Sequence, residues 1–130
     1  MQSHRLIQRI LAAVAIVFGV VTILSGGRVL LGADPGYVVY KPLLVYNTAM
    51  GFIYAGAGIA AWRSVVRGRA AAGAIFVLNL IVLAAVGTLY SNGGGAVAIE
   101  SVHAMTLRTV VWLVLFAGFA WIVRADTVRR

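Results

Sequence analysis

The segment from Glu100 to Thr109 holds the residues whose types and spacing come nearest to a functional site. It places one of the two histidines, His103, close to Glu100, one of only three acids, and it carries Arg108 into an apolar run. Near a membrane edge an arginine extends its guanidinium toward water, and its planar fork binds carboxylates and phosphates through two bonds. Two interpretations of Arg108 stay open. It is an interfacial anchor beside Trp112, one turn further on, or it binds an anionic headgroup, a quinone or a carboxylate.

Three further polar side chains lie within apolar runs. Asn47, Gly51, Tyr54 and Gly58 follow at helical spacing, so a helix places them on one stripe. Small residues let helix backbones approach closely, which predicts a packing seam; the alternative is a polar cavity lined by Asn47 and Tyr54. Asn79 lies in the middle of another run, where its amide needs a partner. We expect an interhelical hydrogen bond there, with a ligand contact as the alternative.

Cofactor and catalytic motifs are disfavoured by the residue types present. The chain has no cysteine, which excludes thiolate zinc sites and iron–sulfur clusters. Copper suits His103 and Met105, but residues two apart on a helix point to different faces. His4 and His103 fall on opposite predicted sides of the membrane, which excludes a bis-histidine haem within one chain. No nucleophile elbow or phosphate-binding glycine loop occurs, so the sequence favours a non-enzymatic protein without a metal or haem, with quinone or lipid as the candidate cofactors.

The composition indicates lipid as the solvent of this chain. Hydrophobic residues make up 62% and charged residues 11% of the 130 residues, against about 45–50% and about 25% in soluble domains. The net charge of +8 comes from residues at the ends of apolar runs. Such charges are topology signals and lipid contacts, and they do not indicate nucleic-acid binding.

Four apolar runs predict an all-α bundle of four transmembrane helices in a single membrane domain, residues 1–130. The helices are expected at about 6–24, 38–62, 70–90 and 102–123. The first run has 19 residues and spans about 28 Å, close to a hydrocarbon core of about 30 Å. No convincing small-x-small cleavage site follows this run, so we interpret it as a retained helix and not as a signal peptide. Between the runs we expect loops at 25–37 and 91–96, a basic turn at 63–69 and a basic tail at 124–130.

The distribution of basic residues predicts the orientation. Three lie on the side of the two Gly-rich loops: Arg28, Lys41 and Arg108. Eight lie on the side of the termini: Arg5, Arg9, Arg63, Arg67, Arg69, Arg124, Arg129 and Arg130. The sequence therefore predicts cytoplasmic N- and C-termini and outer Gly-rich loops.

The outline of the chain resembles the small bacterial four-helix membrane proteins of the DoxX-like class. The residues that carry the resemblance are Gly26, Gly27 and the Gly-rich segment 51–58. The resemblance implies a quinone-linked or redox-accessory role. The acidic residue that this class often places in its second helix is absent between Phe52 and Tyr54, and no functional residue is carried over.

Two functions follow as expectations. The first is a non-enzymatic subunit or accessory protein of a bacterial inner-membrane assembly, in contact with the bilayer and with other membrane subunits or a second copy of itself. The second is a small transporter or a lipid- or quinone-binding protein with a polar site near the outer leaflet. Its candidate residues are Asn47, Tyr54, Asn79, Glu100, His103, Arg108 and Trp112.

Overall fold

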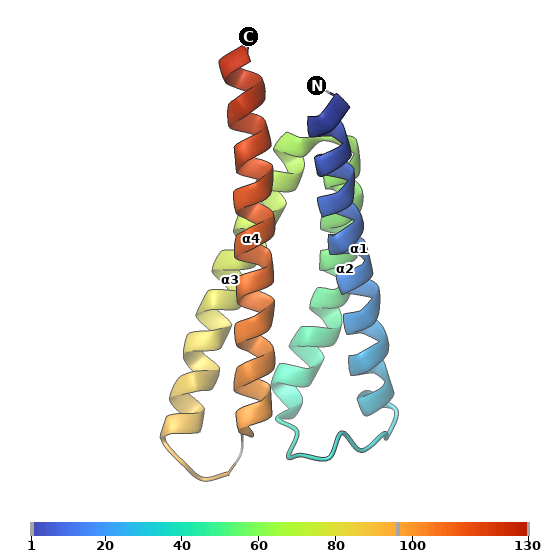
Figure 1. Ribbon diagram of the computed structural model, residues 1–130. Helices are drawn as coiled ribbons and strands as arrows, with labels where there is room; N and C mark the ends of the chain where they lie inside the picture. The colour runs from blue at the N-terminus through green and yellow to red at the C-terminus, as the bar shows by residue number, and fades with distance from the viewer. Residues whose placement is uncertain (1, 96, 130) are drawn as a thin grey trace.

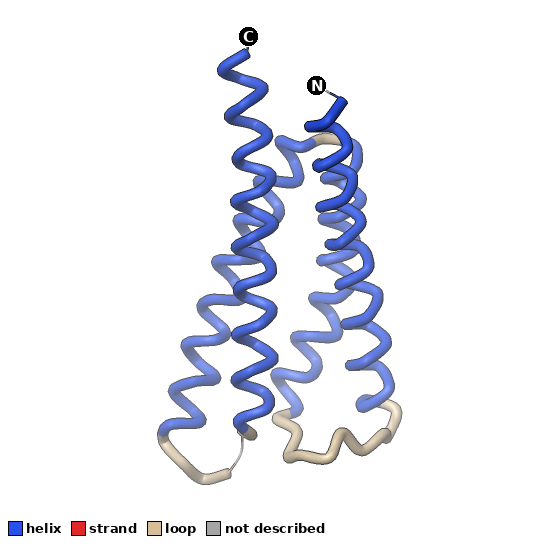
Figure 2. The backbone as a smooth tube through the Cα atoms, in the orientation of Figure 1, coloured by secondary structure: helices blue, strands red, loops and turns tan. Residues whose placement is uncertain are grey.

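The computed structural model describes residues 2–95 and 97–129 as four antiparallel helices joined in sequence (Figure 1). They are α1 (Gln2–Leu30), α2 (Lys41–Arg63), α3 (Val65–Ser91) and α4 (Ile99–Arg129). Both chain ends lie at one end of the bundle, which we call the terminal end. The connecting residues 31–40, 92–95 and 97–98 lie at the opposite end, the loop end, as the tan segments of Figure 2 show.

Each of the four helices is long and apolar enough to cross a membrane. Large apolar side chains cover their outer faces, as at Val17, Phe52, Ile81 and Val114, all of them more than half exposed. A soluble domain does not present apolar surface of this extent on every helix, whereas a bilayer solvates it. The predicted all-α, four-helix architecture of a multi-pass membrane protein is confirmed at this level.

The helices extend beyond the apolar runs. The prediction of a loop over 25–37 is wrong for residues 25–30, which are helical. α1 continues through Gly26 and Gly27 to Leu30, and the Leu31 amide still donates to the Gly27 carbonyl at 3.0 Å. The turn comes at Gly32, whose φ of 111° lies in the left-handed region that favours glycine. Hydropathy indicates the length of chain that lipid solvates, but a helix ends where its backbone hydrogen bonds end.

The predicted basic turn at 63–69 is also wrong, because the connection between α2 and α3 is the single residue Ser64. Its extended backbone (φ −149°, ψ 117°) ends one helix and begins the next. The Ser64 amide donates to the Ala60 carbonyl, and its Oγ accepts from the Arg67 amide at 3.4 Å. One serine thus caps two helices. The predicted tail at 124–130 is helical as far as Arg129, and Arg130 lies outside the described residues.

The seam predicted on the second helix is confirmed. α1 and α2 pack along one another, and Gly51 and Gly58 face the backbone of α1 so closely that a Cβ would meet it at 2.8–3.0 Å. Gly19 presents the matching surface from α1, where a Cβ would lie 2.5 Å from the Ala55 amide nitrogen. α3 and α4 form the second closely packed pair. The bundle is therefore two hairpins laid side by side.

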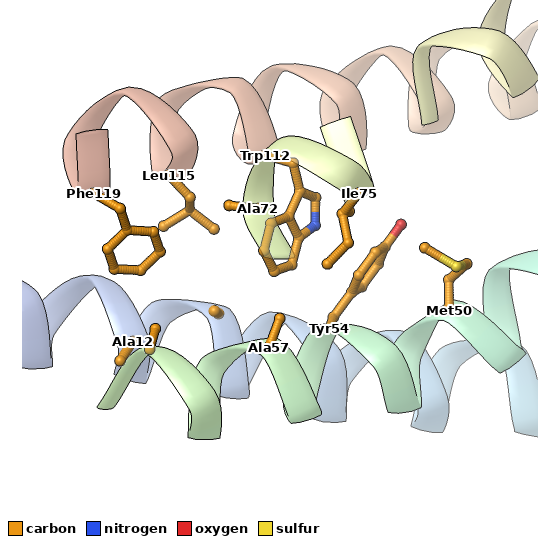
Figure 3. Close-up of a cluster of buried hydrophobic side chains, with 11 residues drawn as sticks. Ala12, Met50, Tyr54, Ala57, Ala72, Ile75, Trp112, Leu115 and Phe119 are labelled. Carbon is orange, nitrogen blue, oxygen red and sulfur yellow. The ribbon is translucent and has the colours of Figure 1, made fainter. Parts of the chain in front are cut away.

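Aromatic side chains fill the space between the hairpins. Trp112 of α4 and Tyr54 of α2 point toward one another, with ring centroids 4.9 Å apart (Figure 3). Both side chains are fully buried, with Leu115 and Phe119 continuing the contact along α4 toward the terminal end. A second, smaller apolar cluster joins α2, α3 and α4 near the loop end through Leu43, Val86, Val97 and Met105.

Polar contacts hold the terminal end. The His4 Nδ1 atom lies 3.2 Å from Asp126 Oδ1, which ties the start of α1 to the last turns of α4. The Gln8 side chain donates to the Ala61 carbonyl at 2.7 Å, across α1 and α2.

Candidate functional site

A buried polar network occupies the middle of the bundle. The Tyr46 hydroxyl donates to Asn79 Oδ1 at 2.8 Å, and Asn79 Nδ2 donates to the Tyr54 hydroxyl at 3.0 Å. Asn79 is fully buried and joins α3 to α2 through these bonds. The predicted interhelical hydrogen bond of Asn79 is confirmed, with two tyrosines as its partners.

Nearer the loop end, a polar pocket of about 110 Å³ opens between α1, α2 and α4. α2 contributes Asn47, and α4 contributes Ser101 and Arg108. Tyr37 and Tyr40, from the connection that precedes α2, cover the pocket. Its remaining walls are Thr22, Ser25, Gly26, Val29, Val39, Leu43, Leu44 and Ala104. Asn47 lies six residues after the first residue of α2 and Arg108 nine after that of α4; these separations correspond to about 9 Å and about 13 Å along the helices.

Arg108 is the residue of this pocket whose charged side chain has neither a counter-charge nor a hydrogen-bond partner in the described part of the chain. Its Nε atom is enclosed and has no hydrogen-bond partner. In the described part of the chain, its guanidinium forms no ion pair or hydrogen bond with any residue. Tyr37, Tyr46 and Tyr54 come within electrostatic range of the guanidinium, but neutral phenols do not balance a full positive charge.

All three acids of the chain lie away from Arg108. Asp126 is at the terminal end beside His4, and Asp34 is exposed, with Oδ1 accepting from the Gly36 amide at 2.8 Å. Glu100 is exposed on the first turn of α4 and does not line the pocket. A partly buried guanidinium without a counter-charge is costly, because burial removes hydration that only an anion replaces fully. The positive charge of the pocket is therefore unbalanced by any carboxylate of the described residues.

Asn47 contributes a second atom without a partner. Asn47 lines the same pocket, and its Oδ1 is closed to solvent and accepts no hydrogen bond within the described residues. Two residues of the pocket lining, Arg108 and Asn47, thus each hold a buried polar atom without a hydrogen-bond partner.

The structure brings together only some of the predicted site residues. Asn47 and Arg108 both line the pocket, whereas Tyr54 and Asn79 belong to the polar network in the middle of the bundle. The alternative of a cavity lined by both Asn47 and Tyr54 is therefore corrected, since only Asn47 reaches it.

The other predicted residues of α4 take different places. His103 is exposed and, like Glu100, does not line the pocket. The Trp112 ring packs on Tyr54, and its enclosed Nε1 has no acceptor. Among the described residues, a cation–π contact is formed by Arg9 and Trp62 at the terminal end, where Arg9 Cζ lies 5.2 Å from the centroid of the Trp62 ring.

Sequence reasoning missed Tyr37, Tyr40, Tyr46 and Ser101. Tyr46 precedes Asn47 and so falls off the stripe of small residues that drew attention to α2. Tyr37 and Tyr40 reach the pocket through the path of a connection, which helical periodicity does not describe. A tyrosine-rich segment beside a Gly-rich loop was the available signal, because tyrosine supplies a polar tip at membrane interfaces.

No protein-family model matches the chain, and no curated protein or solved structure shows significant similarity to it. The resemblance to the DoxX-like class stays a prediction from outline.

The chemistry of the pocket is that of binding. Its described lining offers one permanent cation, an amide and several hydroxyls, with no carboxylate or imidazole to serve as a general base. The described residues contain no group of three or more His, Asp or Glu side chains placed to hold a metal ion. The positive charge and hydrogen-bonding groups of this set are complementary to a small anion.

Proposed function

We propose that this chain is a non-enzymatic membrane protein that binds a small anionic group, a phosphate or a carboxylate, in the pocket of Arg108 and Asn47. The observation that carries the proposal is the partly buried guanidinium of Arg108, which has no counter-charge among the described residues and whose Nε has no hydrogen-bond partner. A hydrogen bond to a charged group contributes about 1.5–3 kcal/mol, and here the anion also supplies the counter-charge that the described residues do not.

The volume of the pocket supports a compact group over a quinone ring. A cavity of about 150 Å³ is the size that encloses benzene, whereas this pocket measures about 110 Å³. A phosphate or carboxylate group fits such a space, and a substituted ring does not fit it fully enclosed.

The proposal includes an orientation. We place the terminal end in the cytoplasm and the pocket in the outer half of a bacterial inner membrane. The support is the excess of basic residues at the terminal end, where eight of the 11 lysines and arginines lie in the sequence.

Substitutions of Arg108 test the proposal, with Arg28→Leu as a matched control. Arg28 is exposed near the loop end and lies outside the pocket lining, so its loss removes the same charge from the same end. Variants purified in mild detergent are compared by mass spectrometry for the anionic lipid or small anion that they retain. We expect Arg108→Leu to lower retention at least about tenfold, the lower end of a lost charge-assisted hydrogen bond.

Arg108→Lys keeps the charge and the ability to extend toward water but lacks the planar fork. We expect it to fold like the parent and to retain an intermediate amount of anion. Equal retention by the Arg108→Leu and Arg28→Leu variants contradicts the proposal, because the pocket would then make no special contribution.

The role of a subunit in a larger membrane assembly stays a prediction. The exposed apolar faces of the helices suit lipid and protein neighbours equally. The same purification tests it, since a subunit carries a second protein in fixed stoichiometry.

A further inference from the structure

The terminal end of the bundle carries positive charge that no carboxylate of the described residues balances. Asp126, an acid at this end, lies 3.2 Å from His4 through its Oδ1 atom. Four exposed arginines, which we call the arginine cluster, come from three helices: Arg5 and Arg9 of α1, Arg63 at the end of α2, and Arg67 in the first turn of α3. In the described part of the chain no ion pair joins any of the four to an acid. Their counter-charge has to come from outside the chain.

Contacts between α1 and α2 bring the members of the cluster to one junction. The connection between α2 and α3 lies at the terminal end beside the start of α1 (Figure 1). The Gln8 side chain donates to the Ala61 carbonyl at 2.7 Å, and Arg9 Cζ lies 5.2 Å from the centroid of the Trp62 ring. Arg63 follows Trp62 directly in the sequence. The arginines of α1 and α2 are therefore held close to one another.

The contact with Trp62 positions Arg9 and leaves its donors available. Stacking uses the flat face of a guanidinium, whereas its N–H groups point outward in the plane of the group. The Trp62 ring is 44% exposed and lies at the end of a helix that can span a membrane. A tryptophan in that place lies at the level of the lipid headgroups. Phosphates occupy the same level, and an arginine binds a phosphate through two parallel hydrogen bonds.

The surface next to the cluster is apolar, which indicates a lipid as the partner. Leu6 and Ile10 follow Arg5 and Arg9 in the sequence and are more than half exposed. Both lie in the part of α1 that is apolar enough to cross a membrane. A molecule that joins phosphate to hydrocarbon chains contacts the arginines and this apolar surface together. A soluble phosphate contacts only the arginines.

The number of cations indicates how many phosphates the lipid carries. One phosphate diester has a single negative charge and leaves most of the charge of four arginines unbalanced. When two diesters belong to one molecule, binding of the first makes binding of the second intramolecular, which raises the overall affinity. We infer that the arginine cluster, with Trp62 as the platform under Arg9, is a site for a phospholipid with two phosphate diesters, as in diphosphatidylglycerol. The site lies at the opposite end of the bundle from the pocket of Arg108, and it does not rest on the function proposed for that pocket.

Two lipids that differ in the number of diesters test the inference. Diphosphatidylglycerol has two phosphate diesters, and phosphatidylglycerol has one. Binding of each to the delipidated, purified protein is measured by native mass spectrometry at equal concentrations of phosphate, with phosphatidylcholine as the neutral reference. We expect diphosphatidylglycerol to bind at least about tenfold more tightly than phosphatidylglycerol. Equal affinity per phosphate overturns the two-phosphate site, and this comparison does not depend on the folding of any variant.

Two charge-matched variants locate the site. Arg9→Leu/Arg63→Leu removes two cations from the cluster, and Arg28→Leu/Lys41→Leu removes two exposed cations from the loop end. We expect the first variant to bind diphosphatidylglycerol at least about tenfold more weakly than the parent protein, and the second to bind it like the parent. Equal affinities of the two variants overturn the site, because binding would then follow net charge alone. Far-UV circular dichroism checks the fold of both, and the single variant Arg9→Leu replaces a double variant that does not fold.

Trp62→Leu separates a positioned site from a simple accumulation of charge. This variant keeps every arginine but removes the ring against which Arg9 packs. We expect it to weaken binding of diphosphatidylglycerol and to leave the low affinity for phosphatidylcholine unchanged. An affinity for diphosphatidylglycerol equal to that of the parent protein overturns the role of Trp62 as the platform.

Discussion

The close backbone contact between α1 and α2 at Gly58 gives a testable prediction about packing. A Cβ on Gly58 would lie 2.8 Å from the Ala12 carbonyl oxygen and 2.8 Å from the Ile16 amide nitrogen of α1. These are backbone atoms, so no rotamer change relieves the contact, and α1 must move away from α2. Gly56, on the same helix, has open space where its Cβ would be. Gly58→Ala and Gly56→Ala therefore add the same methyl group with opposite steric consequences.

The comparison isolates packing from helix propensity. Replacing glycine by alanine within a helix gains about 0.8–1.0 kcal/mol, and this gain applies at both positions. Overpacking costs about 1–3 kcal/mol, and it applies only at Gly58. We expect the free energy of unfolding of Gly58→Ala to fall below that of Gly56→Ala by about 1–3 kcal/mol.

Unfolding in mixed micelles, with sodium dodecyl sulfate as denaturant and far-UV circular dichroism as the signal, measures this difference. Gly56→Ala should match or exceed the parent protein, which makes it an internal control for expression and reconstitution. Coincident unfolding curves for the two variants would refute the reasoning, because they would show that α1 does not lie against Gly58.

Two further predictions concern the network and the topology. Asn79→Leu leaves the two tyrosine hydroxyls of the network without their amide partner, so it should lower the free energy of unfolding by about 1–3 kcal/mol in the same assay; a variant as stable as the parent contradicts the role of the network. Reporter fusions at Arg67 should give a cytoplasmic signal and fusions at Gly94 an outer one; a cytoplasmic Gly94 reverses the proposed orientation.

The membrane helices were predictable because the bilayer imposes a length and a polarity on each. The seam was predictable for a related reason: Gly51 and Gly58 repeat at helical spacing, and close approach of backbones requires small residues there. Asn79 was identified as needing a partner, since an amide in hydrocarbon cannot stay unbonded. The identity of these partners could not be predicted, because it depends on which faces of α2 and α3 meet.

The ends of the helices and the composition of the pocket were beyond sequence reasoning. Ser64 resembles any other polar residue of a basic stretch, and only its backbone angles show that it is the entire connection. Likewise Arg108 was singled out by its type, but its lack of a carboxylate partner depends on the three-dimensional distance to three acids elsewhere. Tyr37 joins the pocket because the connection before α2 folds back over it. Long-range geometry of this kind leaves no periodic trace in a sequence.

The single-residue connection at Ser64 has a mechanical consequence. Ser64 and the pair of His4 and Asp126 join the two hairpins at the terminal end, whereas the cluster around Met105 that joins them near the loop end is apolar. Beyond the hydrogen bonds of Asn79 with Tyr46 and Tyr54, the two hairpins are thus held by apolar packing toward the pocket. α2 has 23 residues and is about 34 Å long, so a tilt of about 5° about Ser64 displaces the loop end by about 3 Å. That displacement is comparable to the width of a polar group, so the width of the pocket is sensitive to small rotations about the terminal end.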